Sequence, residues 1–150
     1  KAAVYNRVLI EEIGLSNPRD CLGYRLIAKS VERSADHAAR IASIIPTITT
    51  PMNGKATEAL IAMSSLAQEI HENSMKALYK YDSKLIEESM SKIKQVIDLE
   101  EEVIEQLLKL KIEPRAMVGI RLILESIRRI AEYGTDIAEI AINLAVKRPS

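Results

Sequence analysis

The feature that most constrains this chain is an internal repeat that aligns without a gap. Residues 18–42 read PRDCLGYRLIAKSVERSADHAARIA, and residues 114–138 read PRAMVGIRLILESIRRIAEYGTDIA, at a constant offset of 96. Eleven of the 25 positions are identical, and several of the others exchange one apolar residue for another. Self-similarity at a fixed period indicates that one structural unit is used twice.

Prolines and glycines divide the chain into predicted helices. Asn17-Pro18 is typical of a helix start, and the stretch Pro46–Gly54, with two prolines and a final Asn-Gly, is typical of a linker. No segment alternates apolar and polar residues for long enough to predict a strand. The last predicted helix carries an apolar stripe at three- and four-residue steps, formed by Ile120, Ile123, Ile127, Ile130, Ile137, Ala141 and Leu144. The helices are expected over residues 2–13, 18–45, 55–81, 82–112 and 114–147. The predicted fold class is therefore all-α, an up-and-down helical bundle.

The position of the two copies predicts the domain organisation. Two full helices precede the second copy, so residues 55–150 are expected to form a complete three-helix unit. Only the helix over 2–13 precedes the first copy, so residues 1–45 are expected to be the second half of another unit, joined by the linker 46–54. The rest of that unit is expected to have preceded Lys1.

A half-unit should expose apolar surface that its missing helices would cover. We expect a strip formed by Leu26, Ile27, Ile41 and Ile44 to be under-covered in a monomer. The isolated chain is expected to cover this strip by forming a homodimer or by repacking its first helices.

Composition excludes several classes of protein. The 21 basic and 21 acidic residues give a formal net charge of zero, which argues against a nucleic-acid binder. The single cysteine, Cys21, cannot form an internal disulfide, and no apolar run is long enough to span a membrane. There is no secretory signal, so a cytoplasmic location is expected. No nucleophile elbow, glycine-rich phosphate loop or HExxH motif is present, and we therefore expect no enzymatic activity.

Two pairs of acidic residues are candidate metal ligands. Glu32 and Asp36 stand one helical turn apart in the first copy, and Glu132 and Asp136 do so in the second. Carboxylates held in this way can chelate hard cations such as iron, manganese or magnesium, and zinc is a further candidate. Ordinary solvated helix charges in ion pairs are the alternative, and the spacing alone favours that alternative.

The remaining polar side chains give weaker signals. Neither His37 nor His71 lies in the Glu-x-x-His pattern of di-iron oxidases, and His37 is expected at a surface or boundary position. Cys21 is expected to be a small buried residue. An acidic run is expected to form a solvated helix face, and it contains Asp98, Glu100, Glu101, Glu102 and Glu105.

Residues 30–42, SVERSADHAARIA, resemble the signature of the phosphate-uptake regulator (PhoU) family, which has the pattern Glu-Arg-x-x-Asp-His-x-x-x-Ile-Ala. The resemblance covers nearly the whole chain, and residues 14–22 look especially like archaeal members. It implies a protein of PhoU-like three-helix repeats, of which this chain holds one complete repeat and half of another. It also implies a non-enzymatic role, because family members damp phosphate import by an ABC transporter and restrain a partner sensor kinase.

Some PhoU proteins bind multinuclear metal clusters through Glu/Asp-x-x-x-Asp pairs. Glu32 and Asp36 match that motif in the first copy. In the second copy Arg128 replaces the first acid, while Glu132 holds the Asp position and Asp136 the next polar position. The family's acidic pair on the second helix of each unit is also replaced, here by Ile93 and Ile97.

Three functions are compatible with these observations. The leading one is a regulator of phosphate or other ion uptake that acts through protein partners. The second is a metal-binding module that requires its metal. The third is the effector or dimerisation domain of a transcription regulator whose DNA-binding domain is absent from this chain.

Overall fold

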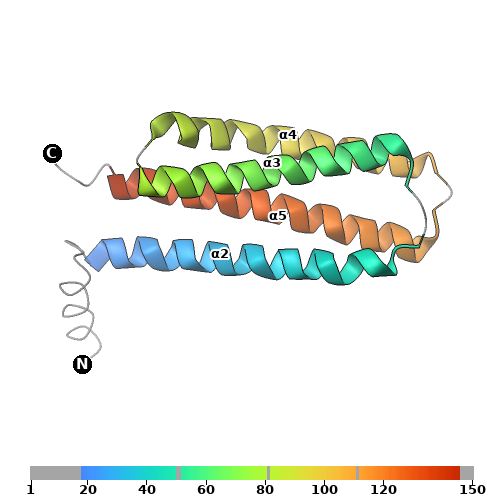
Figure 1. Ribbon diagram of the computed structural model, residues 1–150, viewed down its shortest axis with the longest axis horizontal. Helices are drawn as coiled ribbons and strands as arrows, with labels where there is room; N and C mark the ends of the chain where they lie inside the picture. Colours follow the sequence, from blue (N-terminus) through green and yellow to red (C-terminus); the bar gives the residue numbers. More distant parts are fainter. Residues whose placement is uncertain (1–17, 50–51, 81, 111, 146–150) are drawn as a thin grey trace, which may run out of the picture.

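The computed structural model describes residues 18–49, 52–80, 82–110 and 112–145, and within these ranges it is helical and contains no strand. The helices are α2 (Pro18–Ile44), α3 (Gly54–Tyr79), α4 (Ser83–Leu108) and α5 (Pro114–Ala145), with a 3-10 turn η1 (Ile45–Thr47) after α2. They run up and down in an elongated bundle (Figure 1). The predicted all-α class is confirmed. In the described part of the chain, no helix is both long enough and apolar enough to cross a membrane.

Local side-chain chemistry sets the ends of the helices. Asn53 Oδ1 accepts a hydrogen bond from Ala56 N at 2.7 Å, so α3 begins at Gly54, inside the segment predicted as linker. Asp82, the first residue of the helix predicted over 82–112, caps α4, because its Oδ1 accepts a hydrogen bond from Lys84 N at 3.0 Å. Both α3 and α4 end a few residues earlier than predicted. The helix expected over 2–13 lies outside the described residues.

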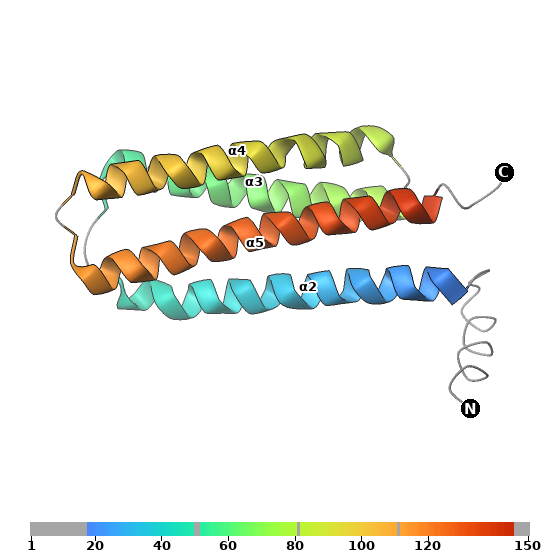
Figure 2. The same cartoon turned by 180° about the vertical axis from the view of Figure 1, so that it is seen from behind.

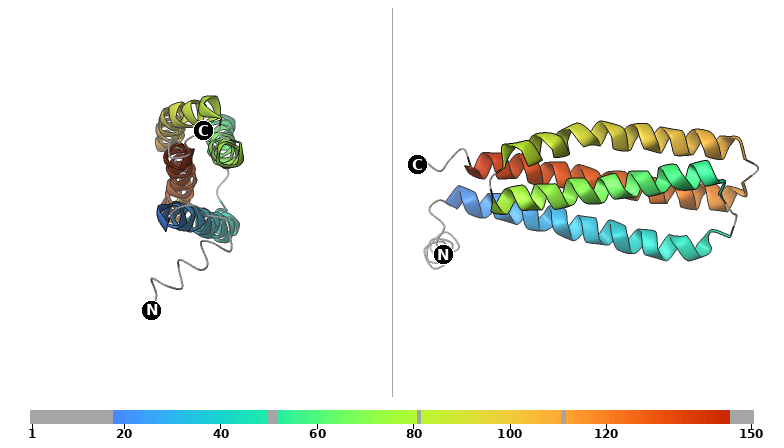
Figure 3. Two further views of the ribbon diagram at one scale, coloured as in Figure 1. Left: turned by 90° about the vertical axis from the view of Figure 1, so that its left-hand side faces the viewer. Right: turned by 45° about the horizontal axis from the view of Figure 1, so that its top comes forward.

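Helices α3, α4 and α5 pack on one another as a three-helix bundle, and α2 lies antiparallel along α5 (Figures 1 and 2). Viewed along the bundle, α5 is between α2 and the α3–α4 pair (Figure 3). Among the described elements α2 packs only against α5 and η1. The central core contains Met63, Ala67, Ile70, Val96, Val103, Leu107, Ile120, Leu124, Ile127 and Ala131. The bundle of α3, α4 and α5 is thus built around α5, which also supports α2.

The two copies of the repeat contact each other reciprocally. A Cβ atom added to Gly23 would lie 3.1 Å from Leu144 Cδ2, and one added to Gly119 would lie 3.4 Å from Ile48 Cγ1. Gly119 follows Gly23 by 96 residues, and Leu144 follows Ile48 by the same interval. Repeat-equivalent residues therefore make the same contact in both directions, as an approximate twofold between α2 and α5 requires.

The centre of this pairing brings equivalent residues together. His37 and Tyr133 occupy matching positions, and their rings lie 5.9 Å apart between centroids at an interplanar angle of 39°. Arg33 places its guanidinium carbon 5.8 Å from the centroid of the Tyr133 ring. His37 is half-buried here, as expected for a boundary histidine.

The prediction that an apolar strip on α2 is left uncovered is wrong in large part. Only Leu26 is well exposed, at 48%, whereas Ile27 is 6% exposed. Ile41 and Ile44 are half-buried against the central core. The reason is that α5 covers this side of α2, which single-helix periodicity could not reveal. Cys21 is half-buried rather than buried, which corrects a second expectation.

Candidate functional site

The first acidic pair lies on exposed helix surface. Glu32 is paired with Lys29, with Oε2 2.6 Å from Nζ, and its side chain is 58% exposed. The hydrogen bond and positive charge of Lys29 hold the pKa of Glu32 below its ordinary value. Asp36 is exposed one turn further along. The two carboxylates share a helix side as predicted, but one of them already has a cationic partner.

The second acidic pair lies in a mixed charge environment on α5. Glu132 accepts hydrogen bonds from Arg128 Nη1 at 3.2 Å and Arg129 Nη1 at 2.9 Å. Burial raises the pKa of Asp136, and the charges of Glu139 and Glu132 raise it further. Glu132, which was expected to be a metal ligand, is therefore already paired with two neighbouring arginines.

These residues do not fit a multinuclear metal centre. Within the described residues, no group of three or more His, Cys, Asp or Glu side chains is placed to hold a metal ion. Hard cations in proteins usually take six or more oxygen ligands, of which two carboxylates would supply a minority. The acidic pairs therefore offer at most a peripheral, water-rich site.

A buried glutamate that the sequence did not single out joins α4 to α5. The side chain of Glu100 is only 8% exposed, and its carboxylate is bonded to Arg121, while Arg128 Nε lies 3.1 Å from its Oε2. The expectation that Glu100 belongs to a solvated acidic face is wrong, although Asp98, Glu102 and Glu105 are exposed as expected. The sequence did contain a signal for the burial of Glu100. It lies at three- and four-residue steps in line with Val96, Val103 and Leu107, which are all buried. Two arginines compensate the buried charge, as such burial requires.

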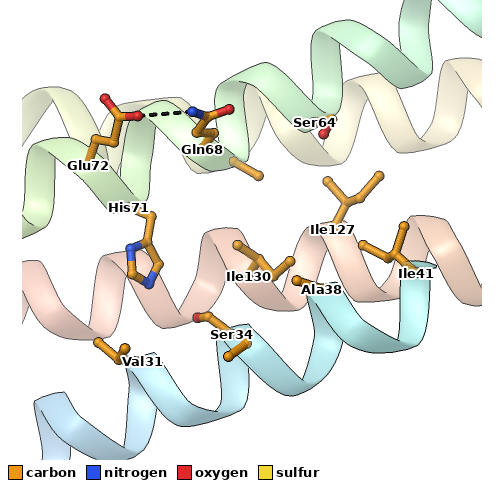
Figure 4. Close-up of a pocket in the computed structure, with 12 residues that line it drawn as sticks. Val31, Ser34, Ala38, Ile41, Ser64, Gln68, His71, Glu72, Ile127 and Ile130 are labelled. Carbon is orange, nitrogen blue, oxygen red and sulfur yellow. Dashed lines mark hydrogen bonds between the residues drawn. The ribbon is translucent and has the colours of Figure 1, made fainter. Parts of the chain in front are cut away.

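An apolar groove of about 400 Å³ runs between α2 and α3, with α5 as its floor (Figure 4). The side chains that form its walls are mostly small or apolar, and the polar ones lie mainly on the α3 side. The lining residues are Val31, Ser34, Ala35, Ala38 and Ile41 from α2, Ser64, Ala67, Gln68, His71 and Glu72 from α3, and Ile127 and Ile130 from α5. A second concavity, of about 430 Å³, lies between α3 and α4, but most of its lining side chains are charged or polar: Lys55, Glu58, Glu102 and Gln106.

His71 projects from α3 into this groove, toward Val31 and Ser34 (Figure 4). Burial lowers its pKa below the ordinary value of 6.5, which favours the neutral imidazole. Its Nε2 is buried and has no hydrogen-bond partner among the described residues. At the rim, Gln68 Nε2 donates to Glu72 Oε1 at 3.0 Å. The groove thus combines an apolar lining with one unpaired polar atom, which is typical of a binding surface rather than of a catalytic site.

Comparison with known families agrees with this geometry. The PhoU domain matches residues 60–141, which is more than half of the chain and covers most of α3, all of α4 and most of α5. The chain belongs to the PhoU family. This family regulates phosphate uptake and is not enzymatic. A search of curated proteins and a search of solved structures each found no match.

Proposed function

We propose that this PhoU-family chain regulates the uptake of phosphate, or of another ion, by binding other proteins. The observation that carries the proposal is the groove between α2 and α3, which is open, apolar and bounded by helices. Grooves of this shape suit an amphipathic helix from a partner, which buries its apolar side in the groove. Family membership supplies the process that such binding would control.

The partner is proposed to be a phosphate ABC transporter or the sensor kinase that works with it, as the family resemblance implies. Binding would hold the partner in one of its conformations, because a ligand shifts an equilibrium only by its different affinity for the two states. No reaction at the groove is needed for that effect.

Uptake measurements in the native cell test this proposal. Deleting the coding sequence should raise the rate of phosphate uptake in phosphate-rich medium, because the restraint on import is removed. Potassium uptake measured in the same cells distinguishes phosphate from another ion as the regulated species. If neither uptake rate changes, the proposed function is wrong.

Metal binding by the acidic pairs stays a separate proposal. If a cation binds, Glu32 with Asp36 and Glu132 with Asp136 are the proposed ligands, and the affinity should be weak because few oxygens converge there. Calorimetric titration measures the affinity for manganese(II) of the native chain and of the Glu32→Ala/Asp36→Ala variant, which lacks the first pair. Equal affinities in the two proteins would remove the first pair from the ligand set.

Self-association of the isolated chain also stays a proposal. Exposed apolar side chains on α2 include Leu22 at 58%, Leu26 at 48% and Val31 at 39%, and their burial would favour a homodimer. Sedimentation at micromolar concentrations should then show a species of twice the mass of the chain, and a strictly monomeric chain would contradict this.

A further inference from the structure

Helix α4, which lies on the side of the bundle opposite to α2 (Figure 3), carries an outward line of apolar side chains. Met90 and Ile97 are each 41% exposed, and Ile104 is half-buried. Residues at seven-residue steps stand two turns apart on one side of a helix, so these three side chains follow one another along α4. We refer to them as the α4 row. Among the described elements only α3 and α5 pack against α4, and Met90 and Ile97 remain exposed beside them.

Two residues of opposite charge flank the α4 row, and neither has a partner among the described residues. Lys94 and Glu101 are both exposed, and the ion pairs found in the described part of the chain include neither of them. They stand seven residues apart, which is about 10 Å along a helix. Ion pairs on one helix form at three- or four-residue spacing, so the two cannot readily serve each other.

A second copy of α4, placed antiparallel on the row, supplies both missing partners. Lys94 lies three residues before Ile97, and Glu101 lies four residues after it. A twofold axis beside Ile97 therefore brings Lys94 of each copy opposite Glu101 of the other. The same axis sets Met90 opposite Ile104 of the second copy, and the two Ile97 side chains meet near the axis. In such an isologous contact every interaction occurs twice.

The charges along the whole of α4 favour the same direction. Residues 83–97 contain three lysines and two glutamates, whereas residues 98–108 contain five acidic residues and no basic one. Of these five, only Glu100 is buried and paired with arginines. An antiparallel pair of helices sets the acidic half of one copy beside the more basic half of the other. A parallel pair would set the two acidic halves side by side, where like charges repel.

We propose that the α4 row binds the α4 row of a second copy of this chain, antiparallel about a twofold axis beside Ile97, with Lys94 and Glu101 paired on both sides of the axis. The groove between α2 and α3 takes no lining residue from α4, so both grooves of the dimer stay open. Two linked grooves bind two sites on one partner more tightly than either groove alone. The proposal goes beyond the proposed function and does not depend on it, because it concerns the contact between two copies.

Sedimentation of the full chain at high micromolar concentration measures this dimer. The native chain should dimerise, and Ile97→Glu should weaken the dimer by at least about tenfold, because it brings two carboxylates together at the axis. Ile61→Glu is the matched control, since Ile61 lies on α3 and is 61% exposed, and it should leave dimerisation unchanged. Leu26→Glu should also leave it unchanged, whereas it would weaken an association through the exposed side of α2.

A charge exchange tests the ion pair and the direction of the helices. Lys94→Glu and Glu101→Lys should each weaken the dimer several-fold, because each sets like charges opposite one another at two places. The double variant Lys94→Glu/Glu101→Lys restores opposite charges in an antiparallel pair and should recover most of the native affinity. A parallel pair would gain nothing from the double exchange. Circular dichroism of each variant verifies that the chain remains folded.

Four results would overturn the proposal. They are a native chain that stays monomeric, equal dimerisation of the native chain and Ile97→Glu, no recovery in the double variant, and a dimer that Leu26→Glu weakens while Ile97→Glu does not. The first would leave the α4 row to a different protein, and the last would assign the contact to α2. None of these measurements involves ion uptake, so failure of the dimer and failure of the regulatory function can be told apart.

Discussion

Replacing Gly134 with alanine perturbs a close approach of α5 to α3. A Cβ atom at this position would lie 2.9 Å from Ile70 Cγ2, 3.1 Å from His71 N and 3.2 Å from His71 Cα. Two of these three atoms belong to the backbone of α3, so no side-chain rotation can make room for the methyl group. The two helices have to separate locally, and the packing of Ile70 in the core is disturbed with them.

Two opposing effects set the size of the change. Alanine is favoured over glycine inside a helix by about 1 kcal/mol. Overpacking a tight core typically costs about 1–3 kcal/mol, and contact with a rigid backbone belongs at the upper end of that range. Gly134→Ala should therefore lower the free energy of unfolding by about 1–2 kcal/mol. For a chain of this length, that corresponds to a fall in Tm of roughly 2–8 °C.

Two other glycines on the α2–α5 contact provide matched controls. A Cβ at Gly23 or Gly119 would meet side-chain atoms, of which the nearest are Leu144 Cδ2 at 3.1 Å and Ile44 Cγ2 at 3.3 Å. These atoms can shift by a few tenths of an ångström, so helix propensity should dominate and the variants should be as stable as the native chain or slightly more stable. Urea unfolding followed by far-UV circular dichroism measures all three variants. If Gly134→Ala proves as stable as Gly119→Ala, the close contact between α5 and α3 is refuted.

Two further predictions concern buried polar groups. Removing both cationic partners of Glu100, in Arg121→Ala/Arg128→Ala, should lower the free energy of unfolding in urea by about 3 kcal/mol, because a buried charge is left unpaired. Adding Glu100→Leu to this variant should recover most of the loss. No recovery would show that the arginines stabilise the protein by packing alone. Burial lowers the pKa of His71, so the unfolded chain takes up a proton there before the folded chain does, and stability should fall as the pH drops through about 6.5. His71→Gln should reduce the loss of stability between about pH 7.5 and pH 5, and an unchanged pH profile would contradict the burial of this imidazole.

Much of the helical architecture could be predicted from local sequence signals. Pro18 and Pro114 mark the starts of α2 and α5, and Asp82, the first residue of the predicted fourth helix, caps α4. The constant offset of the repeat makes Gly23 and Gly119 equivalent positions, and the two residues make reciprocal contacts in the structure. These features are local, or follow from comparing two segments, and so they can be derived without knowing which helices touch.

The site was harder to predict because it depends on which helices are neighbours. The groove exists because α2 and α3 both border α5 without packing on each other, and helical periodicity does not contain that information. The burial of Ile27 follows from the same arrangement. Glu100 was misjudged for a different reason, since its acidic neighbours along the sequence suggested solvent while its place in an apolar stripe indicated burial. The metal ligands inferred from the acidic pairs stay a prediction.

Phosphate uptake by cells that carry an altered groove tests the central claim most directly. Ala35 lines the groove between α2 and α3, whereas Ala62 is exposed on α3 outside it. Cells in which the native coding sequence is deleted would receive the native chain, Ala35→Glu or Ala62→Glu, each at equal abundance. The account predicts that the native chain and Ala62→Glu both restore the slower uptake of phosphate-rich cells, whereas Ala35→Glu leaves uptake as fast as in the deletion. Full restoration of control by Ala35→Glu would contradict the claim that the chain regulates uptake through a protein bound in this groove.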